Sequence, residues 1–154
     1  MHSVAIVGAG ELGGALAHVL ARRAIVRRIE LIDPAGQIAA GKALDIMQAG
    51  PVEGFSTALR GSTDVSRVAG SGIVLIADFA KGDSPPDPLL IVKQVMTLAP
   101  RAVIVPAHGE SVPVTAAATS HIVVRSAIGP ADRRAPEFRR AAARETTRFG
   151  AGST

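Results

Sequence analysis

Short apolar runs alternate with longer amphipathic stretches along the chain, which is the pattern of a parallel sheet covered by helices on both faces. The apolar runs predict strands at 4–7, 29–32, 56–60, 73–77, 102–105 and 121–125. The stretches between and after them predict helices at 12–22, 36–48, 64–69, 89–98, 112–118 and 136–148. We therefore expect residues 1–154 to form a single doubly wound α/β domain, a Rossmann domain with a six-stranded, mainly parallel sheet.

Two details of the helices follow from the same pattern. In the first helix, apolar residues at helical spacing predict the face that packs on the sheet, and His18, which lies off this face, is expected in solvent. The second helix, 36–48, is expected to stop at Gly50 and Pro51, because proline disfavours continuation of a helix. The residues of the expected packing face are Leu12, Leu16, Val19 and Leu20.

A glycine-rich turn lies between the first expected strand and the first expected helix, with the spacing G-x-G-x-x-G. Gly8 permits a tight turn, Gly10 leaves room for a pyrophosphate, and Gly13 lets the helix lie close to the strand. The free N–H groups at the start of the helix then face the phosphates, assisted by the helix dipole. The expected cofactor-binding residues of this turn are Gly8, Gly10, Glu11, Leu12 and Gly13.

Asp33 follows the second expected strand, 20 residues after Gly13, which is the spacing of a ribose-binding carboxylate. Its carboxylate would accept hydrogen bonds from the adenosine ribose and repel a 2′-phosphate, so the sequence predicts NAD rather than NADP as the cofactor. The alternative is that Asp33 and Pro34 only form a turn, since Asp favours turns and Pro restricts the residue before it.

The composition limits the other functions. The chain has no Cys, which excludes a disulfide framework, a thiol nucleophile and a Cys-based metal site, and we expect no metal. It shows no membrane-spanning run and no signal-peptide pattern, so we expect a cytoplasmic protein without a membrane partner. The net charge is +4, and much of the basic excess lies from residue 131 onward, where an Arg-rich C-terminal helix is expected at 136–148. Without interleaved aromatic residues, a solvated helix face is favoured over a nucleic-acid surface.

The stretch Gly41–Pro51, GKALDIMQAGP, resembles the helix after the second strand in the NAD-binding half of the lactate/malate dehydrogenases, malate dehydrogenases in particular. The segments Gly61–Asp64 and Val68–Ser71 are also similar to that family, and the resemblance is close over 3–77. It implies that the glycine turn cradles the pyrophosphate of NAD and that Asp33 holds the adenosine ribose.

The resemblance also implies a partner, because this helix lies at a two-fold interface in dehydrogenase dimers. It predicts a homodimer through the helix at 36–48, with Lys42, Leu44, Asp45 and Met47 at the interface. The alternative is an ordinary sheet-covering helix with Lys42 and Asp45 in solvent.

The chain departs from this family after the strand at 73–77. Asp78 and Phe79 stand where the family has a turn of small residues; Asp78 would repel the cofactor phosphates, and Phe79 is bulky. No Arg lies between residues 67 and 101, so the substrate loop lacks its bidentate clamp, which Lys81 does not replace. His108 is expected to be a neutral loop residue. The catalytic domain of the family is not encoded in 1–154, so we expect no catalytic residue.

Three functions stay open at this point. The first is a stand-alone NAD-binding domain of the malate dehydrogenase type, which is an oxidoreductase relative whose hydride transfer depends on a partner chain. The second is a catalytically inactive homodimeric module, structural or regulatory, that does not bind NAD. A third possibility is an enzyme that uses the pocket for a nucleotide sugar or S-adenosylmethionine. The glycine turn favours the first function, and Asp78 and Phe79 favour the second.

Overall fold

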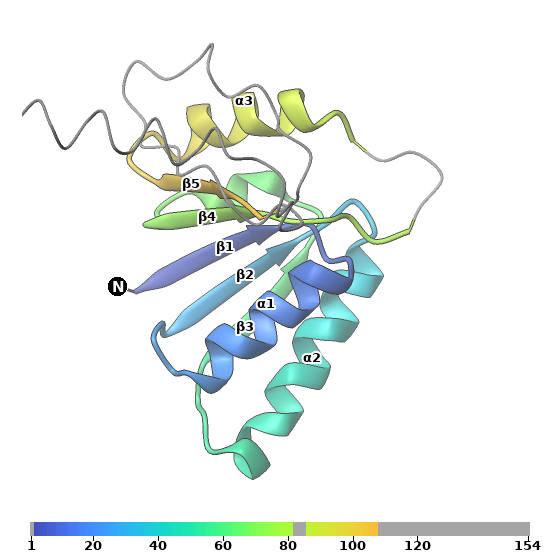
Figure 1. Cartoon of the computed structure of the whole chain (residues 1–154), viewed down its shortest axis with the longest axis vertical. Helices are drawn as coiled ribbons and strands as arrows, with labels where there is room; N and C mark the ends of the chain where they lie inside the picture. The colour runs from blue at the N-terminus through green and yellow to red at the C-terminus, as the bar shows by residue number, and fades with distance from the viewer. Residues whose placement is uncertain (1, 82–85, 108–154) are drawn as a thin grey trace, which may run out of the picture.

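A computed structural model describes residues 2–81 and 86–107. These residues form a five-stranded parallel sheet with helices on both faces (Figure 1), so the expected doubly wound α/β fold is confirmed. The expected elements at 112–118, 121–125 and 136–148, and His108, lie outside the described residues. The elements in chain order are β1 (Ser3–Val7), α1 (Glu11–Arg22), β2 (Arg28–Ile32), α2 (Gly36–Glu53), β3 (Ala58–Ser62), the 3-10 helix η1 (Val65–Val68), β4 (Ile73–Ile76), α3 (Pro88–Leu98) and β5 (Val103–Pro106).

The strands are arranged in the order β3-β2-β1-β4-β5, and every neighbouring pair is parallel. Val7, the last residue of β1, lies between Ile32 of β2 and Ile76 of β4. The chain winds to one side of β1 first and then to the other, so the switch point lies between β1 and β4. In such sheets, ligands bind outside the carboxyl ends of the strands at the switch point. The loops that follow β1, β2 and β4 meet at this edge.

The side chains of β1 are buried on both faces of the sheet, which explains its continuous apolar sequence. Val4 and Ile6 belong to a core shared with α1 and α2, whereas Ala5 and Val7 belong to a core shared with η1 and α3. Figure 1 shows α1 and α2 on the near face of the sheet. Because β1 is the central strand of the sheet, the loop that follows it is anchored from both sides.

The face that α1 turns to the sheet differs from the expected one. The buried residues of α1 are Gly13, Ala17 and Ala21, which recur every four positions. Leu16 and Leu20 pack partly buried against the core, but Leu12 and Val19 are 36% and 48% exposed. The expectation was wrong for Leu12 and Val19, because α1 lies so close to the sheet that small residues occupy the centre of the contact.

The end of α2 also differs from the expected one. The helix continues through Pro51 to Glu53 and ends at Gly54, whose φ is 79° and whose N–H donates to the carbonyl of Gly50. Proline in the last turn removes only one helical hydrogen bond, and the left-handed glycine supplies the stop. The Glu53 carboxylate accepts a hydrogen bond from His18 and forms an ion pair with Arg22, both of α1. The other described elements lie within two residues of their expected bounds.

Candidate cofactor site

The glycine turn joins β1 to α1 at the switch point of the sheet. Gly8 has a φ of 110°, which favours glycine, and a Cβ there would collide with the carbonyl groups that follow β4. The Gly8 N–H donates to the carbonyl of Ile32 at 2.7 Å, and the Gly10 N–H donates to the carbonyl of Asp78 at 2.9 Å. The turn is therefore held by backbone hydrogen bonds on both sides, from the ends of β2 and β4.

The other two glycines keep the start of α1 free of side chains. A Cβ on Gly13 would collide with the carbonyl of Gly8, so α1 can approach the strand this closely only with glycine at this position. Gly10 is the N-cap residue of α1 and supplies no side-chain cap. Glu11 and Leu12 form the first turn of the helix and point their side chains outward, where both are exposed. The N–H groups of this turn therefore need an acceptor from elsewhere.

Asp78 supplies that acceptor. Its Oδ1 accepts a hydrogen bond from the Gly13 N–H at 2.9 Å, and a Cβ on Gly10 would collide with its carboxylate. The carboxylate therefore lies over the first turn of α1, where the helix dipole favours an anion. This is the position where a dinucleotide of this fold places its pyrophosphate.

Asp33 lies at the end of β2, at its expected place, and is 1% exposed. Its Oδ2 accepts hydrogen bonds from the N–H groups of Ala9 at 2.7 Å and Ala80 at 2.9 Å, and its Oδ1 accepts one from Ala35 at 2.8 Å. The last contact is the Asx turn that the alternative interpretation anticipated. The carboxylate thus ties together the loops after β1, β2 and β4. Its contact with a ribose stays a prediction.

Lys42 is a residue of the site that the sequence did not reveal. Its Nζ donates to the carbonyl of Gly10 at 2.6 Å, and its aliphatic stem lies beside Gly14. Lys42 is half-buried against the turn rather than in solvent, whereas Asp45 is exposed. No sequence spacing could have indicated this contact, because Lys42 comes from α2 and reaches the turn only through the packing of α2 on α1.

Phe79 lies beside the site but turns toward a different part of the molecule. Its side chain is half-buried and packs against the core on the face of η1 and α3. The next charged residue, Lys81, is exposed. Among the described residues of this loop, the acidic group that faces the glycine turn is Asp78.

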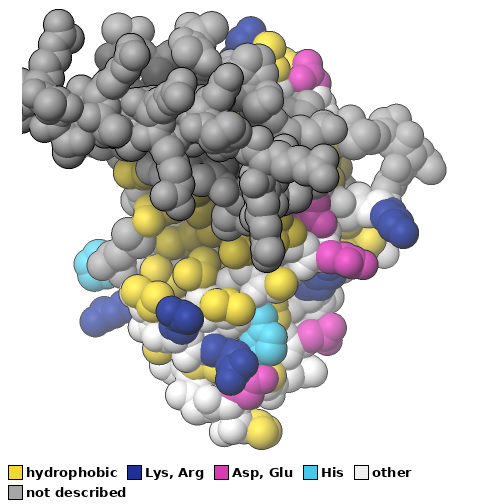
Figure 2. Space-filling view, in the orientation of Figure 1, with side chains coloured by type: hydrophobic (Ala, Val, Ile, Leu, Met, Phe, Trp, Pro, Cys, Tyr) yellow, Lys and Arg dark blue, Asp and Glu magenta, His cyan; other side chains and the backbone are white. Residues whose placement is uncertain are grey.

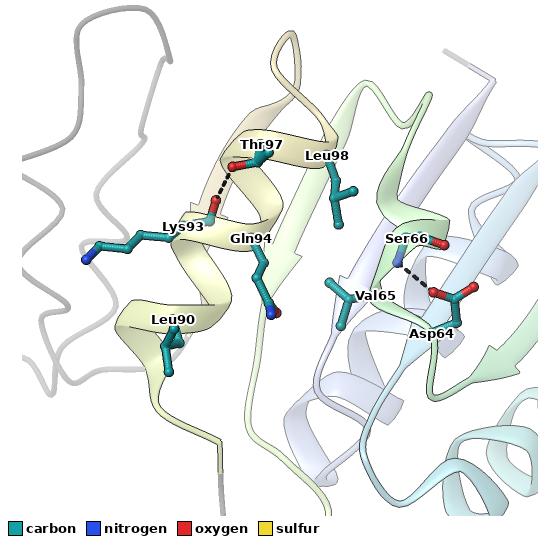
Figure 3. A pocket seen from close by; sticks show the side chains of 8 residues that line it. All are labelled: Asp64, Val65, Ser66, Leu90, Lys93, Gln94, Thr97 and Leu98. Atoms are coloured by element: carbon teal, nitrogen blue, oxygen red, sulfur yellow. Dashed lines mark hydrogen bonds between the residues drawn. The ribbon is translucent and has the colours of Figure 1, made fainter.

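A second concave region lies between η1 and α3, with a volume of about 430 Å³ (Figure 3). Its charged groups do not converge, because the Lys93 side chain points away from Asp64. Hydrogen bonds from the side chain and N–H of Ser66 lower the pKa of Asp64, so this carboxylate already has local partners. The glycine turn is the stronger candidate site. The residues that line the second region are Asp64, Val65, Ser66, Leu90, Lys93, Gln94, Thr97 and Leu98.

Residues 2–81 and 86–107 offer neither a metal site nor a membrane span. No group of three or more His, Asp or Glu side chains in these ranges could hold a metal ion. None of the helices in these ranges is long and apolar enough to cross a membrane.

A parallel sheet of this strand order, with a G-x-G-x-x-G turn at its switch point, defines a Rossmann domain of the dinucleotide-binding class. Residues 2–82 match the family described as lactate/malate dehydrogenase, NAD binding domain. The chain therefore belongs to the lactate/malate dehydrogenase family through its NAD-binding domain, and NAD is the cofactor of this family of domains.

The similar proteins include malate dehydrogenases. The enzyme of Neorickettsia sennetsu is 40% identical over 73 residues, which cover 47% of this chain and 23% of the relative. The enzyme of Chlorobium phaeobacteroides is 44% identical over 73 residues, which cover 47% of this chain and 24% of the relative. The chain thus spans about a quarter of the length of the curated relatives it matches.

Solved structures agree on the fold. Malate dehydrogenase from Salinibacter ruber has a TM-score of 0.59 at 24% identity, over 70% of this chain and 37% of that protein. Lactate dehydrogenase from Eimeria maxima, solved with NADH and oxamate, has a TM-score of 0.60 at 20% identity, over 71% of this chain and 36% of that protein. Each match covers less than half of the solved protein.

In domains of this fold, the backbone of the glycine turn is where a pyrophosphate binds. At Gly8 and Gly13 a Cβ would meet the protein's own backbone, so these glycines allow the tight turn and the close approach of α1, whereas at Gly10 a Cβ would take the space in front of the N–H groups of α1. One side chain of the chain itself lies in this cradle, the carboxylate of Asp78. A bound cofactor would need this side chain to turn away.

Proposed function

We propose that the chain binds NAD(H) at its glycine turn, as a cofactor-binding domain of the lactate/malate dehydrogenase type. The observation that carries the proposal is the cradle of Gly8, Gly10 and Gly13 at the N-terminus of α1. The N–H groups of the first turn, at Glu11 and Leu12, add donors for the phosphates. The negative charge of Asp33 beside the turn supports NAD over NADP, whose additional phosphate it would repel.

The proposal includes no hydride transfer by the described residues alone. Hydride transfer needs a substrate held against the nicotinamide beside an acid or base. The loop after β4 carries no Arg for a bidentate clamp on a substrate carboxylate. We therefore include in the proposal a partner chain that supplies the catalytic groups.

We also propose a cytoplasmic location. The absence of Cys from the chain supports it, because disulfides are rare in the cytoplasm.

A second function is favoured by one observation. The Asp78 carboxylate in the phosphate position favours a homodimeric module that keeps the fold without binding NAD. The two functions make opposite predictions for one titration.

The test is a fluorescence titration with NADH, whose emission is easily followed because the chain has no Trp and no Tyr. The unaltered chain is expected to saturate, and Gly10→Val is expected to bind at least about tenfold more weakly, because a side chain there fills the cradle. The matched control is Gly41→Val, since no atom lies within 4 Å of a Cβ at Gly41. Absence of binding to the folded, unaltered chain at millimolar NADH would reject the proposal and support the second function.

We also propose that α2 forms a homodimer interface. Leu44 and Met47 lie one turn apart on α2 and are 50% and 38% exposed. Figure 2 shows hydrophobic side chains among the charged ones on the face formed by α1 and α2. Exposed apolar residues of this size are typical of an interface when they cluster.

Leu44→Glu is expected to convert the dimer into monomers, because a charge would be buried against its own copy at a two-fold interface. Multi-angle light scattering measures the mass directly. Gln94→Glu, which adds a charge at an exposed position of α3 on the other face of the sheet, is the control and is expected to stay dimeric. A monomeric unaltered chain would refute the interface.

A further inference from the structure

The Asp78 side chain takes the place of a ligand at the start of α1. Its carboxylate accepts from the Gly13 N–H, 65 residues away in the chain, while its backbone carbonyl accepts from the Gly10 N–H. The backbone of Asp78 is therefore fixed against the turn, and only its half-exposed side chain is free to rotate. The cradle can be opened without moving the sheet.

The charge of this carboxylate is balanced by the helix rather than by a cation. Among the described residues, no Lys, Arg or His nitrogen lies within 4.0 Å of it, and the nearby Lys42 ammonium is engaged by the carbonyl of Gly10. The N–H groups and dipole of α1 are thus its partners, as they would be for a phosphate. A carboxylate and a phosphate cannot occupy this position together, because they need the same donors and repel each other.

We propose that Asp78 is an internal anion that gates the glycine turn and weakens its affinity for ligands that carry a pyrophosphate. This inference rests on the proposed function, because it concerns the regulation of the same site. The side chain closes the cradle by binding the Gly13 N–H and opens it by rotating into solvent. Ligands with phosphates must displace it, whereas a nucleoside without phosphate does not compete with it.

A purely structural role makes a different prediction. If Asp78 only caps α1, as an N-cap side chain does, its replacement lowers stability and leaves the affinity of the folded protein unchanged. If Asp78 gates the site, its replacement raises the affinity for phosphate-bearing ligands specifically. The two roles are therefore distinguished by whether the gain in affinity requires a phosphate on the ligand, and not by the change in stability.

The experiment compares the unaltered chain with Asp78→Asn and Asp78→Ser. Both variants remove the charge; Asn keeps an oxygen that can accept from the Gly13 N–H, and the shorter Ser leaves that N–H to solvent at a half-exposed position, so both are expected to fold. Isothermal titration with NADH, ADP and adenosine measures the affinities. We expect NADH and ADP to bind about tenfold more tightly or better in both variants, and adenosine to change by less than about twofold. Asp45→Asn, which removes an exposed negative charge on α2, is expected to change none of them.

Each other outcome is decisive. Equal NADH affinity in the unaltered chain and the variants would overturn the gate and leave the proposed function intact. Absence of NADH binding in all folded chains would overturn both. An equal gain for adenosine would also overturn the gate, because the effect would then not involve phosphate. Loss of folding in both variants, seen by circular dichroism, would assign Asp78 to the structural cap and overturn the gate.

Discussion

Gly61→Ala is expected to lower the free energy of unfolding by about 3 kcal/mol, the upper range for overpacking of a well-packed contact. Gly61 lies in β3, and a Cβ there would collide with the backbone of Ala39 and Ala40 in α2. Backbone atoms of a packed helix cannot yield as the end of a flexible side chain can, so α2 would have to move away from the sheet. Urea unfolding, followed by circular dichroism, measures the loss.

The matched control for this change is Gly41→Ala. It adds the same methyl group on α2, where no atom lies within 4 Å of the new Cβ. It is expected to raise the free energy of unfolding by about 0.5–1 kcal/mol, because alanine favours a helix interior over glycine. A loss of less than about 1 kcal/mol for Gly61→Ala would contradict the close packing of α2 on β3.

Asp33→Asn is expected to cost about 3 kcal/mol of unfolding free energy. The buried carboxylate accepts three backbone hydrogen bonds with its two oxygens, and an amide offers only one oxygen. Its NH2 group would face at least one N–H donor at a buried site, which leaves that donor unsatisfied. The same urea experiment measures the change.

Asp45→Asn, which alters an exposed carboxylate, is the control and is expected to stay within about 0.5 kcal/mol of the unaltered chain. A similarly small effect for Asp33→Asn would show that the network around Asp33 contributes little to stability. NADH titration of the folded Asp33→Asn protein then separates the two roles of this residue. A loss of affinity beyond the loss of folded protein indicates a contact with the ribose.

The elements of the fold were predictable because their signals are local. An apolar run such as 73–77 predicts a buried strand, and the structure has β4 at Ile73–Ile76. The errors came from interactions outside the local pattern. Leu12 and Val19 have helical spacing with Leu16, but the close approach of α1 to the sheet selects small residues instead. Pro51 suggests a helix end, but the left-handed Gly54 stops α2.

The candidate site divides in the same way. The glycine spacing and the position of Asp33 are properties of a continuous strand–turn–helix–strand segment, so the sequence predicts where they lie. The sequence does not predict which groups the residues of the site contact. In the structure the Asp33 oxygens accept from backbone N–H groups of three loops, and its contact with a ribose stays a prediction. Lys42 was expected at an interface or in solvent, and it donates to the turn instead.

The sequence by itself determined the α/β class and the glycine turn, because periodicity and motif spacing act over a few consecutive residues. The resemblance of residues 3–77 to a known family added the dehydrogenase-type domain. Only the tertiary structure decided that the Asp78 carboxylate binds the Gly13 N–H at the start of α1. That contact joins residues 65 positions apart. It exists because the strand order places β4 directly beside β1, so the loop after β4 is carried to the N-terminus of α1.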